Sequence, residues 1–263
     1  MKKYLYIFKS ELINSLQYTF DFIIGLISYI IMIFIFLNLW QFIYSDPSEV
    51  INGYTMNQMI WYVILTEIIW MSSKSRLFCN EICDDVRSGN ITYNIIKPYN
   101  YVGYRLFGHL GSNTLRFFLI IIVGISLGLL FLHSFPELNI LSIIGVLLSC
   151  FLALIINDLI IMGFGLISFF IEDAKPFYWI YSKLILVIGT LFPIEFFPMA
   201  LQPIIKYSPV FVVSYGPAKL FVDFSLSMFL KVISAQIIYL LICFIIVHLI
   251  YRKGVRRINV NGG

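Results

Sequence analysis

Residues 22–43 read FIIGLISYIIMIFIFLNLWQFI, an apolar run without a charged side chain. As an α-helix, such a run crosses a hydrocarbon core of about 30 Å. Comparable, mostly apolar runs predict further spans at about residues 56–71, 106–132, 140–170, 178–192 and 229–251. The sequence therefore predicts an all-α, polytopic membrane protein with six transmembrane helices.

The composition agrees with this class. Of the 263 residues, 60% are hydrophobic and 12% are charged, whereas an ordinary soluble domain is about 25% charged. So few ionic groups would not cover the surface of a soluble fold of this size. No polar stretch is long enough for a separate soluble domain, so residues 1–263 are predicted to form a single membrane domain.

Two segments outside the spans have patterns of their own. Residues 1–20 begin with Lys2 and Lys3 and continue with apolar residues near helical spacing, which predicts an amphipathic helix at the membrane interface. Residues 193–228 precede the last span and cannot form one straight helix, because proline removes a backbone donor and clashes within a helix. Broken helices that re-enter or line the outer interface are expected there, around Pro193, Pro198, Pro203 and Pro209.

The distribution of basic residues predicts the orientation. Fourteen of the 18 Lys and Arg lie in the four segments 1–20, 72–105, 172–183 and 252–263. Basic residues concentrate on the cytoplasmic side of membrane proteins. Both termini and the 72–105 loop are therefore predicted to be cytoplasmic, with the chain in the inner membrane of the cell.

Three polar side chains interrupt the predicted spans, namely Glu67, Asn157 and Asp158. A carboxylate at the centre of a bilayer costs about 2.5–3.5 kcal/mol by insertion scales, so such residues usually face a protein interior. They are candidates for a polar substrate path, or else for a helix–helix hydrogen bond or an interfacial position. In the third span, Gly124 and Gly128 form a spaced pair of small residues that predicts close helix packing.

The most informative polar segment is KSRLFCNEICDDVRS, residues 74–88. At helical spacing its apolar side chains form one stripe, and its charged side chains fall largely elsewhere. The segment is either an interfacial helix or a docking element for a soluble partner, with its acidic face toward a basic groove and its apolar side on the membrane domain. The stripe consists of Leu77, Phe78, Ile82 and Val86, and the charged set of Glu81, Asp84, Asp85 and Arg87.

The sequence contains no motif for chemistry of its own. It has no G-x-x-x-x-G-K-[ST] phosphate loop, no H-E-x-x-H and no G-x-S-x-G. The three His lie in separate segments, and the four Cys lack zinc-ligand spacing. The chain is therefore expected to be non-catalytic, with no cofactor or metal of its own.

In their order and sidedness, these features resemble the permease subunits of ATP-binding-cassette exporters of the type-2 class. Residues 81–101, EICDDVRSGNITYNIIKPYNY, are similar to that family's E-I-x-x-x-I-R-x-G-x-[IL] segment followed by [KR]-P. Residues 177–210, FYWIYSKLILVIGTLFPIEFFPMALQPIIKYSPV, are similar to its outer Pro-rich region. The end of the chain, YRKGVRRINVNGG, resembles the G-x-x-R-x-x-x-x-G-G tails of one bacterial subgroup. The resemblance covers nearly the whole chain.

The resemblance implies two paired permeases, identical or sister subunits, each bound to a separate ATPase that holds ATP and Mg²⁺. The helix from about Phe78 to Arg87 would be the coupling helix, seated in a cleft of the ATPase. The segment from Pro193 to Pro209, with Glu195, would be the outward gate. The chain would then export an amphiphilic or lipid-like substrate, such as a drug, a peptide antibiotic or a lipid, from the cytoplasm or inner leaflet. A large extracellular insert, found in longer relatives, is missing, which argues against substrate capture by a dedicated outer domain.

Other functions stay open on the residues alone. An ATP-independent, ion-coupled transporter would use Glu67 and Asp158 to carry protons or bind cations. An intramembrane enzyme has little support, because no His, Asp and Glu cluster in facing segments. A purely structural membrane partner is a further alternative.

Overall fold

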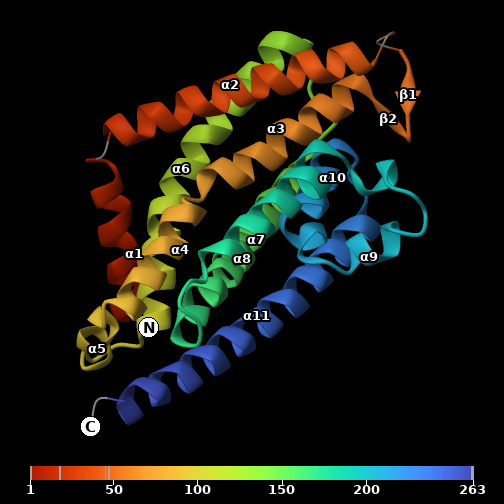
Figure 1. Ribbon diagram of the computed structural model, residues 1–263. Coiled ribbons are helices and arrows are strands. Elements are labelled where there is room, and N and C mark those ends of the chain that lie inside the picture. The colour runs from red at the N-terminus through yellow and green to blue at the C-terminus, as the bar shows by residue number, and fades with distance from the viewer. Residues whose placement is uncertain (1, 18, 45, 47, 262–263) are drawn as a thin grey trace.

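The computed structural model describes residues 2–17, 19–44, 46 and 48–261, and residues 1, 18, 45, 47, 262 and 263 lie outside that description. The described chain is mostly helical, as predicted (Figure 1). In chain order its first elements are α1 (Lys2–Ser15), α2 (Thr19–Ile43), β1 (Val50–Ile51), β2 (Tyr54–Thr55), α3 (Met56–Ser72), α4 (Ser75–Arg87), α5 (Asn90–Ile95) and α6 (Tyr101–Leu132). They are followed by α7 (Ile140–Leu166), the 3₁₀ turn η1 (Ile167–Phe169), α8 (Lys175–Leu184), the π-helical η2 (Ile185–Leu191), the 3₁₀ turn η3 (Ile194–Phe196), α9 (Gln202–Lys206), the π-helical η4 (Phe211–Tyr215), α10 (Gly216–Val222) and α11 (Leu226–Asn261).

Four helical segments of the described chain are long and apolar enough to cross a membrane. They are Phe22–Ile43, Tyr101–Leu132, Ile140–Phe169 and Leu226–Arg257, and they correspond to the first, third, fourth and sixth predicted spans. The second predicted span falls on α3, which has 17 residues, fewer than the roughly 20 that a straight crossing needs. The fifth falls on α8 and η2, where the helix changes from α to π geometry. The predicted count of six spans is therefore confirmed only in part.

The two ends of the bundle differ in what they hold. The start of α1, the short helix α5 and the end of α11 lie together at one end, and the β1–β2 hairpin lies at the other (Figure 1). We call these the inner end and the outer end after the predicted orientation, which stays a prediction. The start of α1 and the end of α11 thus share an end with the loop between α3 and α6. The predicted basic tail continues α11 as far as Asn261.

Helix α3 lies largely inside the bundle. Most of its side chains are buried, and it contacts α2, α6 and α10. The contact with α6 is close because α6 presents glycines there. A Cβ at Gly128 would lie 2.2 Å from the Trp61 ring, and one at Gly124 would lie 2.9 Å from Ile68 Cδ1. The close packing predicted from this glycine pair is confirmed.

A small β-hairpin precedes α3, which the prediction of an all-helical chain missed. Val50 pairs with Thr55 and Ile51 with Tyr54. Asn52 and Gly53 form the turn with positive φ angles of 49° and 85°, the conformation that Asn-Gly favours in a two-residue hairpin. Thr55 then caps α3. Its hydroxyl accepts from the Gln58 backbone N–H, and the Gln58 side chain accepts from the Thr55 backbone N–H. The hairpin therefore fixes where α3 begins.

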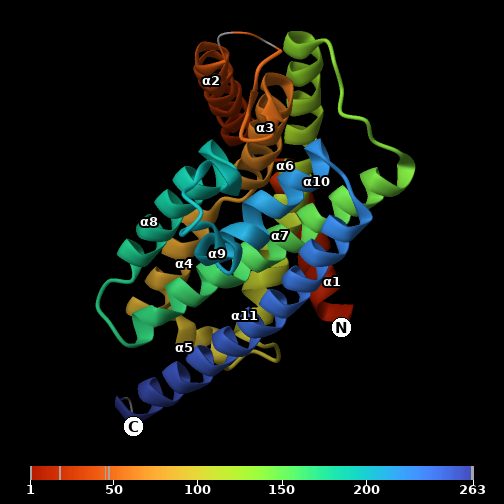
Figure 2. The same cartoon turned by 90° about the vertical axis from the view of Figure 1, so that its right-hand side faces the viewer.

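Helix α1 packs along the first half of α6 (Figure 2). Tyr4 stacks on Phe107 at 5.4 Å between ring centroids. The backbones approach closely at Gly111, where a Cβ would lie 2.4 Å from the Phe8 carbonyl oxygen. The predicted helix is thus confirmed, although it packs against protein. Its other face leaves Leu5, Ile13 and Leu16 exposed, so an interfacial position stays a prediction.

The prolines before the last long helix break the chain as expected. Pro193 follows η2 and Pro203 lies in the first turn of α9, whereas Pro217 lies inside the continuous helical segment formed by η4 and α10. A proline in the first turn of a helix costs little, because the amide there has no intrahelical partner. The predicted broken helices are present, and their re-entry into a membrane stays a prediction.

We expect Gly128→Ala to destabilise the protein by about 1–3 kcal/mol, because the new methyl group overlaps the buried Trp61 ring. Gly163→Ala is the matched control, since a Cβ there would meet its nearest neighbour at 3.8 Å. It should be neutral or stabilising by up to about 1 kcal/mol, as alanine favours a helix. Thermal unfolding in detergent measures both variants. Equal midpoints would contradict the packing of α3 on α6.

Candidate functional site

Asp158 of α7 is the most deeply buried charged residue in the described chain, with no exposed surface. Asn113 Nδ2 of α6 lies 3.0 Å from its Oδ2 and 3.3 Å from its Oδ1. Ser73, between α3 and α4, donates to Oδ1 at 3.2 Å. A buried carboxylate needs such donors, because it has left water behind. Asp158 therefore ties three parts of the bundle together.

His109 of α6 completes the shell around Asp158. Its Nδ1 lies 3.0 Å from Asp158 Oδ2 and 3.0 Å from Asn113 Nδ2, and the tautomer with its proton on Nδ1 donates to the carboxylate. The imidazole ring stacks on Phe78 of α4, with centroids 3.9 Å apart and planes 7° from parallel. Asp158 thus holds one edge of the ring, and the coupling-helix candidate α4 holds its face.

A second chain of hydrogen bonds runs from the same place toward α8. Ser73 and Ser75 share a hydrogen bond of 2.8 Å. Asn157 Nδ2 donates to the Ser75 hydroxyl at 3.2 Å, and the Tyr181 hydroxyl of α8 donates to Asn157 Oδ1 at 3.0 Å. The break between α3 and α4 is therefore the point where polar contacts from α6, α7 and α8 meet. We call these contacts, centred on Asp158, the junction network.

Only two of the three predicted path residues belong to this network. Asn157 and Asp158 lie in it, whereas Glu67 of α3 does not bond to either. Glu67 is buried, and its Oε1 has no hydrogen-bond partner among the described residues. Three residues that the sequence did not single out, His109, Asn113 and Tyr181, do belong to it. His109 and Asn113 are four apart and so share one face of α6, but nothing in the sequence pairs them with Asp158.

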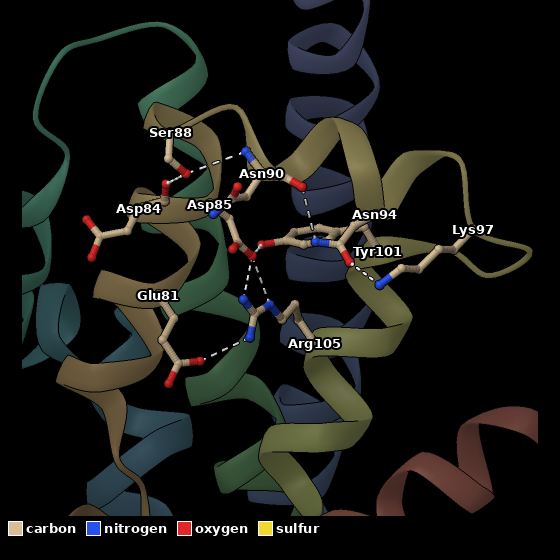
Figure 3. A network of polar contacts seen from close by, with 9 residues as sticks. All are labelled: Glu81, Asp84, Asp85, Ser88, Asn90, Asn94, Lys97, Tyr101 and Arg105. Carbon is tan, nitrogen blue, oxygen red and sulfur yellow. Dashed lines mark hydrogen bonds and ion pairs between the residues drawn. The ribbon is translucent and has the colours of Figure 1, made fainter.

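The predicted coupling helix is α4, and its two sides have different surroundings. Phe78 and Ile82 are buried, and Ile82 packs against Gly165 of α7, where a Cβ would lie 2.7 Å from it. Two of the charged side chains pair with Arg105 of α6 (Figure 3). Arg105 Nη1 lies 3.1 Å from Glu81 Oε2, and Arg105 also bonds Asp85 through Nε at 3.1 Å and through Nη2.

The rest of the polar surface lies at the tip of the inner end. Asp84 is exposed and pairs with Lys175 at 3.3 Å, and Arg87 is exposed. Gly89, with a φ of 75°, turns the chain into α5. The α5 segment then exposes 71% of Tyr93 and 82% of Ile96. Acidic, basic and apolar side chains are therefore mixed at this tip.

The predicted outer gate also has an organised centre. Glu195 accepts hydrogen bonds from the Tyr54 hydroxyl at 3.0 Å and the Tyr215 hydroxyl at 2.5 Å. Burial raises the pKa of both tyrosines well above the usual range, so both phenols stay protonated and act as donors. Glu195 thereby joins the β-hairpin, the broken segment and η4. The prolines are less uniform, since Pro193 is buried and Pro209 half-buried, whereas Pro198 and Pro203 are exposed.

The two π-helical turns meet at one carbonyl. Tyr62 of α3 and Ser214 of η4 both donate to the Gly189 oxygen of η2, at 2.7 and 2.8 Å. A Cβ at Gly189 would lie 2.9 Å from Ser214, so only glycine allows this approach. Single π-helical turns recur at functional sites because they free backbone groups from the regular helix pattern.

The described residues contain no group of three or more His, Cys, Asp or Glu arranged to hold a metal ion. The polar contacts found are instead those of a helix bundle with a charged inner tip. Against known families, the chain matches one described as "ABC-2 family transporter protein" over residues 14–262. This chain belongs to the ABC-2 transporter family. Among curated proteins, none matches it significantly.

Membership makes the chain the membrane permease subunit of an ATP-binding-cassette transporter, a multi-pass protein that associates with an ATP-binding subunit. The match covers nearly the whole chain, as the sequence resemblance did. In this ABC-2 permease, the junction network connects the membrane bundle to α4 and, through α4, to the inner tip. That connection makes the network the candidate functional site.

We expect Asp158→Ala and His109→Ala each to destabilise the permease by about 1–3 kcal/mol, because each leaves buried polar groups unsatisfied. The double variant should lose less stability than the sum of the losses of the two single variants, with an interaction energy of about 0.5–3 kcal/mol. The matched control combines Asp158→Ala with Ser126→Ala, because Ser126 is exposed and lies on α6, the helix that carries His109. Unfolding in detergent measures the cycle. Additive losses for Asp158 and His109 would contradict the contact.

Proposed function

We propose that this permease exports an amphiphilic or lipid-like substrate out of the cytoplasm or the inner leaflet, driven by the ATPase that docks at its inner end. The whole chain acts as one membrane domain in the inner membrane, with both termini cytoplasmic. It pairs with a second permease, identical or sister, within the lipid bilayer. ATP and Mg²⁺ belong to the ATPase.

The observation that carries this proposal is the continuity from the inner tip to the buried carboxylate. The α4 helix has one side packed in the bundle and the other at the surface, and it begins at the Ser73 break that bonds to Asp158. A force applied to α4 by a partner would therefore act directly on the junction network. A chain without an ATP motif needs such an element if ATP is to drive it.

The docking surface is best assigned to the tip formed by α4 and α5. Phe78 and Ile82 support it from beneath, because both are buried. Glu81 and Asp85 are held by Arg105, which leaves Asp84 and Arg87 with the exposed face of α5. Exposed aromatic side chains commonly dominate binding at interfaces. Tyr93 and Ile96 are therefore our leading contacts for the ATPase.

The route for substrate would run between the junction network and the outer gate. Asn157 and Asp158 would line its inner part. Glu195, with Pro193, Pro198, Pro203 and Pro209, would form the gate, where the tyrosine hydrogen bonds must break for opening. In this proposal α3, and α8 with η2, supply the second and fifth of six crossings.

Glu67 supports a second candidate function. A buried carboxylate oxygen without a partner among the described residues is what an ion-coupled transporter would need, because it can bind a proton or cation during transport. Such a transporter would move substrate with an ion gradient alone. ATP-independent, pH-driven flux in vesicles would favour this candidate over the exporter.

We expect Tyr93→Ala combined with Ile96→Asp to weaken binding of the genomically adjacent ATPase by about 2 kcal/mol or more, the cost of losing an aromatic interface anchor. Copurified ATPase and vanadate-sensitive ATP hydrolysis should fall together, while the thermal unfolding of the permease stays unchanged. The matched control is Tyr6→Ala, since Tyr6 of α1 is exposed by 72% and lies outside the tip. Full copurification with the double variant would contradict the docking surface.

A further inference from the structure

A cavity of about 350 Å³ lies at the inner end, between α1, α4 and α6. Its wall carries both charged and apolar side chains. The charged ones are Glu11 of α1, Lys74 just before α4, Glu81 of α4 and Arg105 of α6, and Phe78 and His109 supply aromatic surface. The cavity thus reaches from the surface of the bundle to the edge of the junction network. None of the contacts described so far fills it.

The wall itself has two carboxylates and two cations, and counting Asp85 behind it, which shares Arg105, three carboxylates face the two cations Arg105 and Lys74. Arg105 faces Glu81 and Asp85 together, so one positive charge serves two negative ones. No ion pair or hydrogen bond to the Glu11 carboxylate occurs within the described part of the chain. Lys74, which also lines the cavity, already has an interaction partner. A cationic ligand would therefore be attracted here, and an anionic one repelled.

His109 supplies an independent sign that a ligand is missing. Its side chain is 8% exposed, and its Nε2 has no hydrogen-bond partner among the described residues. In the tautomer that carries its proton on Nδ1, the ring presents Nε2 as an acceptor. A buried acceptor without a donor is unfavourable. An N–H group entering the cavity would remove that penalty.

We propose that this cavity binds the primary ammonium group of an amphiphile. An –NH₃⁺ group has three N–H donors, and the wall offers three acceptors in the carboxylates of Glu11 and Glu81 and in His109 Nε2. The apolar part of the ligand would lie against Phe78 and Leu77, which also lines the cavity. The site therefore selects for a positive charge and for N–H donors together.

Binding at this position has a route to the rest of the permease. A ligand that bonds to His109 contacts the same ring that Asp158 holds by Nδ1 and that Phe78 of α4 covers. The occupant is thus one residue away from the break between α3 and α4. The inference deepens the proposed function by naming the substrate class, and it rests on that function only for the step from binding to export.

The test measures binding of octylammonium to the purified chain in phosphatidylcholine nanodiscs by calorimetry, without the ATPase. We expect saturable binding that Glu11→Gln weakens by at least about tenfold. Glu172→Gln is the matched control, since Glu172 is exposed and lies outside the cavity, and it should bind as the parent does. Octanoate, with a comparable tail and the opposite charge, should bind no more than to empty nanodiscs.

Octyltrimethylammonium separates hydrogen bonding from charge alone, because it is cationic without an N–H donor. We expect it to bind at least about tenfold more weakly than octylammonium. Equal binding of the two cations, binding of octanoate at the octylammonium level, or unchanged binding by Glu11→Gln would each overturn the site. Binding as predicted without ATP-driven flux would leave the site standing and count against the exporter instead.

Discussion

A carboxylate buried among apolar helices must be surrounded by donors, and Asp158 is that carboxylate in this permease. Its partners come from the break after α3 and from α6, so the chain cannot satisfy them without placing those elements correctly. The cost of leaving a charged group unpaired at membrane depth is several kcal/mol. This requirement explains why α3 ends where it does. It also explains why α4, although charged, begins inside the bundle.

The requirement also connects the two ends of the molecule through α3. Ser73, at the inner end of this helix, bonds to Asp158, and Tyr62, three turns earlier, bonds to the π-helical turn at Gly189. At 1.5 Å per residue these two contacts are about 16 Å apart along the helix. A rigid, buried helix that is bonded at both ends would transmit movement at one end to the other. The outer contact lies at a π-helical turn, a feature that is frequent at functional sites.

The sequence was most informative where one local pattern determines the outcome. The apolar runs located four long helices, the prolines located the breaks, and Gly124 and Gly128 located a close helix contact. The amphipathic stripe of residues 74–88 correctly placed Phe78 and Ile82 against the bundle. The Asn52-Gly53 turn is a local signal too, but the strands beside it have only two residues each, too few to show the alternation that predicts a strand.

The candidate site was less predictable, because its residues meet only through tertiary packing. Asp158 stands out in the sequence because a carboxylate within an apolar span is energetically costly. Its partners His109 and Asn113, however, come from a different helix, 45 or more residues earlier. Glu67 also lies in an apolar run, as Asp158 does, yet it stays outside the network. Tertiary packing, which the sequence pattern does not show, separates the two cases. Charge on α4 was likewise easy to see, whereas its pairing with Arg105 depended on how α6 is rotated.

The most direct measurement of the central claim is the distance between the two ends of the permease as ATP is used. Spin labels at Glu172→Cys and Met199→Cys would report it, since the four native cysteines are buried and Met199 is exposed. In the complex with its ATPase, trapping with ATP and vanadate should shift the distance distribution. Asp158→Asn should abolish that shift while ATP hydrolysis continues. An undiminished shift in Asp158→Asn would contradict the claim that the junction network couples α4 to the outer gate.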